Sequence, residues 1–415
     1  MHAVATREHD RLPEIRTSVP GPASRRLAQR LGVVESRNVT CLAPVPPIFW
    51  ARASGSNVWD VDGNRYVDLT GAFGVASTGH AHPEVTAAIA EQATTLVHGM
   101  GDVHPAEVKV ALLEALTARF PGGGPARAVL GCSGADAVET ALKTVLLATG
   151  RPGVVAFEGA YHGLSIGALD LTWRPDFREP FAARLAGATA FAPYGDAESV
   201  AAAAGRLEAA GHPVGAIVVE PVQGRGGEVV PPPGFLSALR ARCDAEGWLL
   251  IVDEIYTGCG RTGRFFACEH EGVVPDLLCV GKGLSAGMPL SACLGRAPVM
   301  DAWPVSHGEA LHTQTFLGHP ASCAAALAAL RVIDRDGLVD VSAAEEPAMH
   351  DEHMELVQPD SVLPAVSQWR FLVVGGPDSL GEWGTEYRQG REIFFGVTTL
   401  SGRVNEDDTV GGPHE

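Results

Sequence analysis

The sequence predicts an α/β fold, in which a large domain with a mostly parallel sheet flanked by helices is joined to a smaller domain. Two observations support this prediction. The chain has 415 residues, whereas a single hydrophobic core usually stops growing at about 250 to 300 residues. From residue 126 onward, short continuous apolar runs alternate with stretches of helical length. Strands that helices bury on both faces have this pattern.

The N-terminal part is expected to contain little regular structure. Residues 1–45 are polar and irregular, which is typical of an arm or a partly ordered lead-in. The first clear element is a β-hairpin over residues 57–69, where two short runs flank a turn of Asp, Gly and Asn at residues 62–64. Apolar residues at helical spacing then predict helices over residues 84–96 and 106–118.

The large domain is expected over residues 76–320, between an arm and small-domain segment at residues 1–75 and a C-terminal small-domain region at residues 321–415. Its strands are predicted at residues 127–130, 154–157, 216–219, 249–252, 277–280 and 290–294. Helices are predicted over residues 135–148 and 235–246. Ligands of such sheets gather at the carboxyl ends of parallel strands, so the residues that follow each strand indicate the site.

The composition argues against nucleic-acid and membrane partners. The formal net charge of -18 repels phosphate backbones and anionic lipids. No uninterrupted apolar run reaches the roughly 18 residues that a membrane span requires. The eight cysteines are scattered, without a Cys-x-x-Cys pair, so we expect free thiols, no metal site and a cytoplasmic protein.

Lysine is rare in this chain, and one lysine stands out. Only Lys109, Lys143 and Lys282 occur among 31 basic residues, and an arginine cannot serve as a neutral amine nucleophile. Lys282 follows a predicted strand and lies between two glycines, a setting of low dielectric that lowers the pKa of an amine. Lys109 and Lys143 lie in amphipathic helical patterns and are expected on solvated faces.

Other strand ends carry residues that complement this lysine. Asp253 follows residues 249–252 and needs a partner if it is buried, although it could equally cap the next helix at the surface. Ser133 and Gly134 open a helix, where they either cap it or bind a phosphate. Tyr161 follows residues 154–157 and could stack on a planar group or simply pack. Pyridoxal phosphate needs a Schiff-base lysine, an acid at its ring nitrogen, a phosphate cup and a stacking group, and these residues supply one of each.

On these residues the chain resembles the class III pyridoxal-phosphate aminotransferases, from about residue 59 to residue 338. Lys282 stands 29 residues after Asp253, a separation that this family shares. The motifs that carry the resemblance lie at residues 79–83, 133–139, 161–163, 220–224, 253–258, 260–263, 282 and 315–320.

The resemblance implies a fold-type I homodimer with a shared active site, which moves an amino group from an amine or amino acid to a keto acid. It implies that Lys282 forms the Schiff base and that Asp253 pairs with the ring nitrogen. Tyr161 would stack on the ring, Gln223 would contact its hydroxyl, and Thr315 would reach the phosphate of the partner subunit. The predicted cofactor-binding residues are Ser133, Gly134, Ala135, Tyr161, His162, Glu220, Gln223, Asp253, Lys282 and Thr315.

The sequence departs from the family pattern at three places. Ala135 replaces a hydroxyl residue of the phosphate cup, and Arg225 stands where many members have a glutamate. We hypothesise that Arg225 lies near a carboxylate of the substrate. After residue 338 the family's late arginine motifs are missing, which indicates an altered or truncated C-terminal segment. Another reaction of the same cofactor, such as that of an aminomutase, racemase or decarboxylase, remains an alternative, as does a catalytically impaired relative.

Overall fold

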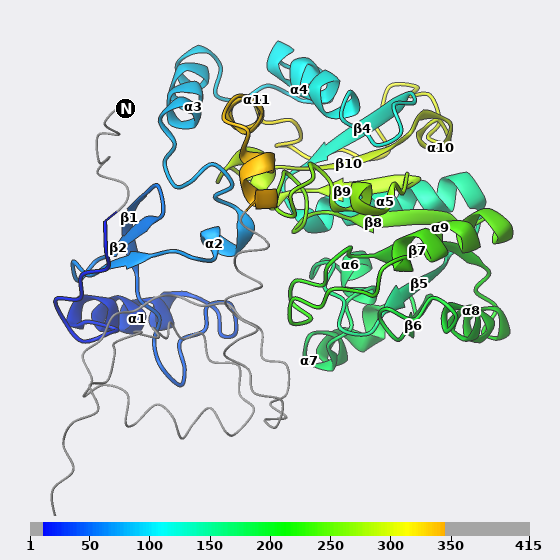
Figure 1. Ribbon diagram of the computed structural model, residues 1–415, viewed down its shortest axis with the longest axis horizontal. Coiled ribbons are helices and arrows are strands. Elements are labelled where there is room, and N and C mark those ends of the chain that lie inside the picture. Colours follow the sequence, from blue (N-terminus) through cyan, green and yellow to red (C-terminus); the bar gives the residue numbers. More distant parts are fainter. Residues whose placement is uncertain (1–10, 345–415) are drawn as a thin grey trace, which may run out of the picture. The chain divides into compact units, whose positions relative to one another are not determined.

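The computed structural model describes residues 11–344, and these form two compact units that meet in sequence at Thr70 and Gly71 (Figure 1). The domain boundaries predicted after residues 75 and 320 stay predictions. The predicted alteration of the C-terminal segment falls on residues that lie mostly outside the described range. None of the helices within residues 11–344 is long and apolar enough to cross a membrane.

The first unit consists of a helix, α1 (Pro22–Val34), and an antiparallel sheet of β1 (Trp50–Ser54), β2 (Asn57–Asp60) and β3 (Arg65–Val67). The pairing of β2 with β3 confirms the predicted hairpin.

The expectation of an irregular arm was wrong for α1. Asp62 in the hairpin turn accepts hydrogen bonds from the amides of Ala23 (2.6 Å) and Ser24 (2.9 Å). A carboxylate 39 residues away therefore caps this helix. Gly21, the residue at the N-cap position itself, makes no side-chain cap, so the local start signal is limited to Pro22 at the first helical position.

The second unit is built on a seven-stranded sheet with the strand order β4-β10-β9-β8-β7-β5-β6. Only β10 runs antiparallel to its neighbours, so the α/β prediction with a mostly parallel sheet is confirmed. The strands are β4 (Ala126–Gly131), β5 (Gly153–Phe157), β6 (Thr189–Ala192), β7 (Val214–Val219), β8 (Leu249–Asp253), β9 (Leu277–Val280) and β10 (Ser291–Arg296).

Helices cover both faces of this sheet (Figure 1). The α-helices are α2 (Gly71–Gly74), α3 (Pro83–Thr95), α4 (Glu107–Thr117), α5 (Gly134–Thr149), α6 (Ile166–Asp170), α7 (Pro175–Arg178), α8 (Val200–Ala209), α9 (Phe235–Glu246), α10 (Ala297–Met300) and α11 (Pro320–Arg335). Short 3-10 helices are η1 (Glu179–Arg184), η2 (Ala267–Glu271) and η3 (Lys282–Ser285).

Alternate residues of the strands enter two separate cores. On one face, Val138 of α5 belongs to a cluster with Val218 and Ile251. On the other face, Leu239 of α9 belongs to a cluster with Ile217 and Leu250. Each of these side chains is fully buried, and burial of such a side chain contributes about 1.5–3 kcal/mol. The sheet is therefore held rigidly between two apolar layers, which fixes the positions of its strand ends.

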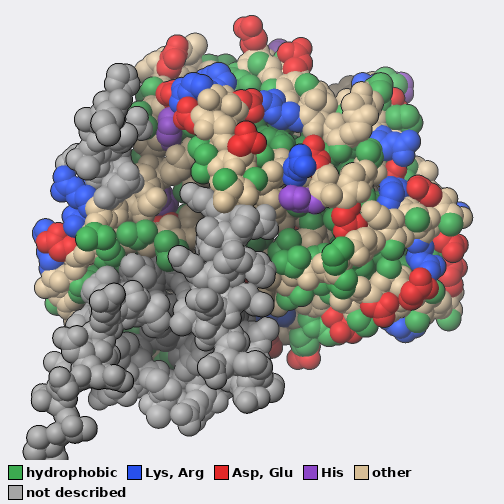
Figure 2. Space-filling view, viewed as in Figure 1, with side chains coloured by type: hydrophobic (Ala, Val, Ile, Leu, Met, Phe, Trp, Pro, Cys, Tyr) green, Lys and Arg blue, Asp and Glu red, His purple; other side chains and the backbone are tan. Residues whose placement is uncertain are grey.

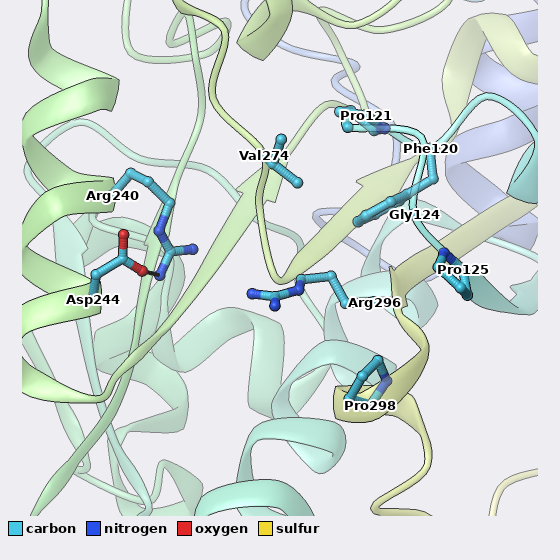
Figure 3. Close-up of a pocket in the computed structure, with 10 residues that line it drawn as sticks. Phe120, Pro121, Gly124, Pro125, Arg240, Asp244, Val274, Arg296 and Pro298 are labelled. Atoms are coloured by element: carbon cyan, nitrogen blue, oxygen red, sulfur yellow. Dashed lines mark ion pairs between the residues drawn. The ribbon is translucent and has the colours of Figure 1, made fainter.

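A cavity of about 460 Å³ lies at the edge of the sheet where β9 begins (Figure 3). Arg240 and Arg296 line it, and both bind the buried carboxylate of Asp276, at 2.7 and 3.0 Å. Asp276 also accepts the amide of Leu250 at 2.8 Å. Arg240 also pairs with Asp244 at 2.7 Å, so two carboxylates balance the two arginines. The contacts of Asp276 anchor two strands. Because Asp276 precedes β9 whereas Lys282 follows it, the cavity and the predicted site lie at opposite edges of the sheet.

Acidic and basic side chains are interspersed on the face shown in Figure 2, with no continuous basic tract across the second unit. All eight cysteines are free, and six of them are buried.

Candidate active site

The predicted site residues lie at one edge of the second unit's sheet, at the carboxyl ends of its parallel strands. Ser133 follows β4, Tyr161 and His162 follow β5, Glu220 and Gln223 follow β7, Asp253 ends β8, and Lys282 follows β9. Parallel strands bring their carboxyl ends to a common edge. The sequence motifs, which are up to 149 positions apart between Ser133 and Lys282, therefore converge in space.

Lys282 opens η3 in a left-handed backbone conformation, with a φ of 33°. Such a conformation is costly for a residue with a side chain and is found mostly where function requires it. Burial lowers the pKa of Lys282, and Arg225 lowers it further, while Asp253 and Glu220 oppose the shift. The lowered pKa increases the fraction of neutral amine, which is the nucleophilic form.

Asp253 is buried, and both of its oxygens have partners. Oδ2 lies 2.7 Å from Nδ1 of His162, and Oδ1 accepts the amide of Ile255 at 3.0 Å. Burial acts to lower the pKa of His162, but the hydrogen bond and charge of Asp253, with the charge of Glu220, raise it overall. The imidazole therefore holds the Asp253 carboxylate in one orientation. The prediction that a buried Asp253 would need a partner is confirmed, and that partner is His162.

Nε2 of His162 is buried without a hydrogen-bond partner in the described part of the chain. An orphaned buried nitrogen is costly. A polar group of a ligand at this edge would be able to satisfy it.

Glu220 is a buried carboxyl group beside the Asp253–His162 pair. Its Oε2 accepts the amide of Tyr161 at 3.1 Å. Burial raises the pKa of Glu220 to about 7, with Asp253 adding to the shift and His162 opposing it. The raised pKa favours the protonated, neutral form of this side chain, which limits the negative charge at the strand edge.

Tyr161 and Arg225 lie together at the rim of the site. The Tyr161 ring packs edge-on against Phe177, with 5.9 Å between the ring centres. The Arg225 guanidinium carbon lies 4.5 Å from the Tyr161 centroid and 5.5 Å from that of Phe177. Within residues 11–344 we find no acidic partner for Arg225. Its positive charge is available to a ligand.

Gln223 is buried between two strand-end loops. Its amide nitrogen donates to the carbonyl of Glu158 at 2.8 Å, and its backbone pairs with Val229 to close the loop that carries Arg225. A Cβ at either Gly159 or Gly226 would lie 2.6 Å from Oε1 of Gln223. The two glycines therefore provide the space that this side chain occupies.

The start of α5 carries the predicted phosphate-binding residues. Ser133 caps the helix, and the Asp136 carboxylate accepts the amides of Cys132 (2.8 Å) and Ser133 (3.0 Å) in return. The Ser133 amide is thus already engaged. The amides of Gly134 and Ala135 belong to the first helical turn, where backbone donors have no partner within the helix.

Thr315 does not follow one of these strands. It lies in an exposed turn just before helix α11. The next residue, Phe316, accepts a weak contact from the thiol of Cys132 at 3.6 Å. The turn therefore lies beside the loop that leads into Ser133. The threonine hydroxyl makes no hydrogen bond within the described residues.

Two further residues belong to this edge and were not predicted. The amine of Lys282 lies 5.5 Å from the centre of the Tyr256 ring. The Tyr256 hydroxyl donates to Glu228 at 3.2 Å, and Glu228 has a left-handed φ of 55°. The tyrosine lay in a recognised motif, but nothing in the sequence around Glu228 indicated that its side chain turns inward.

These residues fit pyridoxal phosphate. An amine of lowered pKa, a buried carboxylate oriented by an imidazole, free helix-start amides and an aromatic ring occur at one edge. They match the aldehyde, ring nitrogen, phosphate and ring face of that cofactor.

Comparisons with known proteins agree with this chemistry. Residues 41–368 match the family model described as aminotransferase class-III. A 4-aminobutyrate aminotransferase of Mycobacterium leprae is 38% identical over 362 residues, which cover 83% of this chain and 79% of that protein. An acetylornithine aminotransferase of Streptomyces coelicolor is 42% identical over 297 residues, which cover 71% and 70%. A crystal structure of an ornithine aminotransferase from Toxoplasma gondii, with pyridoxal phosphate partly occupying its active site, has 30% identity and a TM-score of 0.70, and covers 82% of this chain and 80% of that one.

Proposed function

The chain belongs to the class III aminotransferases, which depend on pyridoxal phosphate, and from this premise we propose how its residues divide the work of amino-group transfer. The proposal rests on the side chains that meet at the carboxyl ends of the parallel strands. There Lys282 has a lowered pKa, and the neighbouring strand ends in the Asp253–His162 pair.

The bound cofactor would supply an aldehyde carbon and a protonated ring that withdraws electrons. The amine of Lys282 would hold the aldehyde carbon, and as a free amine it would move a proton at the substrate carbon as a general base and acid. Asp253 keeps a proton on the ring nitrogen, because its carboxylate stabilises the adjacent positive charge. His162 holds that carboxylate in place.

The remaining residues bind and orient the cofactor. Tyr161 would stack on one face of the ring, and Gln223 would contact the ring hydroxyl. The hydroxyl of Ser133 and the amides of Gly134 and Ala135 hold the phosphate, so the missing hydroxyl at Ala135 leaves this role to the backbone. Glu220 fixes the backbone of Tyr161.

We propose a substrate amine that carries a carboxylate, with a keto acid as acceptor. Two relatives are named for 4-aminobutyrate and acetylornithine, which both carry one. Arg225 supports this assignment, since its guanidinium lies on the Tyr161 ring and has no acidic partner among residues 11–344. Arginine suits this role because its planar donors can bind a carboxylate at two points.

A homodimer with a shared active site is also part of the proposal. Exposed apolar side chains occur in two segments that the Asp102–Thr313 hydrogen bond and the His98–Phe316 ring contact tie together. These side chains are Val97, Met100, Val103, Leu311 and Phe316. A patch of this kind on a soluble domain favours a protein partner, and Thr315 lies in the same turn as Phe316.

Borohydride reduction of the holoenzyme tests the role of Lys282. The reduced cofactor is expected on the peptide that contains Lys282, and Lys282→Ala should carry none. Label on Lys109 or Lys143 in the unchanged enzyme would contradict the assignment.

Amino-donor screening with a keto-acid acceptor tests the reaction class. Transamination consumes one acceptor for each donor, whereas racemisation, an internal amino shift or decarboxylation consumes none. Product without acceptor consumption would favour one of those reactions, and no product from any donor would favour an impaired relative.

A further inference from the structure

Lys109, expected from sequence on a solvated face, is half-buried in the first turn of α4. Its ammonium donates to the carbonyl of Gly101 at 2.6 Å. Burial lowers its pKa, with the charges of Cys323 and Asp102 opposing the shift. A lysine that gives up hydration in this way has a defined position, unlike a lysine that only solvates a surface.

The stem of Lys109 packs against the turn that carries Thr315. A Cβ at Gly318 would lie 2.6 Å from Cδ of Lys109, and one at Gly101 would lie 2.0 Å from the carbonyl oxygen of Leu317. The two segments therefore meet through glycines at both contact points. Only this close approach brings the Lys109 ammonium to Gly101 while its methylene groups lie on Gly318.

A second contact holds the other end of the same turn. The Thr313 hydroxyl donates to Asp102 at 2.7 Å. Thr315 thus lies between two anchored positions, residue 313 and residues 317–318. The residues that hold both positions, Gly101, Asp102 and Lys109, belong to one segment, residues 101–109.

We propose that Lys109 is a positioning residue for the cofactor phosphate, because it fixes the turn from which Thr315 reaches that phosphate. This inference rests on the proposed role of Thr315. Lys109 itself touches neither the cofactor nor the substrate. Its effect is transmitted through the backbone of residues 317–318.

The test compares binding of pyridoxal phosphate with binding of pyridoxal, which lacks the phosphate, to the cofactor-free enzyme by absorbance titration. Lys109→Met, which keeps most of the stem and removes the ammonium, should weaken pyridoxal-phosphate binding about tenfold, as loss of a charged hydrogen bond does. Pyridoxal binding should stay unchanged. Thr315→Ala should show the same phosphate-specific loss, and the double variant should bind no more weakly than Thr315→Ala alone.

Arg331→Met, on the exposed face of the neighbouring helix α11, is the matched control and should bind both ligands as the unchanged enzyme does. If Lys109→Met fails to fold, Thr313→Val removes the other anchor from an exposed position and should weaken pyridoxal-phosphate binding about threefold.

The outcomes distinguish the inferred role of Lys109 from the proposed role of Thr315. Equal weakening of both ligands by Lys109→Met would reduce Lys109 to a structural residue and overturn the inference. A phosphate-specific loss in Thr315→Ala without one in Lys109→Met or Thr313→Val would do the same while leaving Thr315 in its role. No phosphate-specific loss in Thr315→Ala would remove the role of Thr315, and the inference with it.

Discussion

Lys282 shares its strand edge with the ionisable side chains of Asp253, His162 and Glu220. Asp253 and Glu220 hinder loss of the Lys282 proton, whereas burial and Arg225 promote it. Burial keeps Glu220 partly protonated, so the edge carries less negative charge than its two carboxyl groups suggest. The lysine pKa can therefore fall although an acid lies on the next strand.

Glu220→Gln should abolish one pH-dependent loss of stability. Burial raises the pKa of Glu220 from 4.5 to about 7, so between these values the folded protein binds more protons than the unfolded chain. The contribution of Glu220 to the free energy of unfolding is fully present below the unfolded pKa and is lost as pH rises through the folded pKa. It amounts to on the order of 3 kcal/mol.

Urea denaturation of the cofactor-free protein across this pH window measures the effect. The free energy of unfolding of the unchanged protein should fall more steeply with pH than that of Glu220→Gln, which keeps an acceptor for the Tyr161 amide. The Glu220 charge also helps to raise the pKa of His162. That pKa should therefore be raised less in Glu220→Gln, which flattens the pH dependence of the variant in the same direction. Parallel curves would show that Glu220 ionises normally.

Arg225→Ala should impair binding of substrates that carry a carboxylate. Loss of a charged contact predicts a rise in KM of about tenfold or more, with little change for a simple amine that lacks the carboxylate. Arg174 is the matched control, because it also lies over Phe177, at 5.0 Å, but pairs with Asp176. Arg174→Ala should leave both KM values unchanged. If Arg225→Ala raises the KM of both amines alike, Arg225 serves packing and not carboxylate recognition.

At the scale of elements, strands were predictable where continuous apolar residues supply the signal. The prediction of β9 has the same bounds as the strand, and β8 extends only to Asp253. The short, alanine-containing β6 and the alanine-rich α8 went unpredicted, because alanine gives little contrast between a buried and an exposed face. Helix α1 was missed for a different reason, since its cap comes from a remote turn.

Asp62→Ala should destabilise the first unit through α1. The Asp62 carboxylate accepts two amides and the Ser24 hydroxyl (2.7 Å) at the helix start, and removal of a cap costs about 1–2 kcal/mol. Amide hydrogen exchange should show faster exchange in α1 than in the unchanged protein. Asp176→Ala, a control at an exposed site with a single surface ion pair, should leave α1 unaffected. Unchanged protection of α1 in Asp62→Ala would mean that the helix does not depend on this cap.

At the scale of the whole molecule, sequence predicted which residues meet but not how each is held. Because parallel strands end at a common edge of the sheet, Ser133, Tyr161, Asp253 and Lys282 lie at one edge. It does not specify that the Asp136 carboxylate already accepts a hydrogen bond from the Ser133 amide. Such details depend on side-chain directions at loops, and apolar patterns carry no information about them.

The dimer can be tested by mixing subunits that each lack a different part of the site. If Thr315 acts on the partner's phosphate, a dimer of one Lys282→Ala subunit and one Thr315→Ala subunit contains one complete site. Random mixing makes half of the dimers mixed, so activity should recover to about a quarter of that of the unchanged enzyme. Assays at limiting pyridoxal phosphate keep the contribution of Thr315→Ala dimers low.

The reverse mixture provides the control. Unchanged subunits mixed with Lys282→Ala/Thr315→Ala subunits should lose activity, because each intact Lys282 in a mixed dimer then faces a partner without the threonine. If Thr315 instead serves its own subunit, the first mixture stays inactive and the second keeps every unchanged site. With a shared site the first mixture gains activity and the second loses it, whereas with separate sites neither mixture changes. General damage from subunit exchange would lower the activity of the second mixture without raising that of the first.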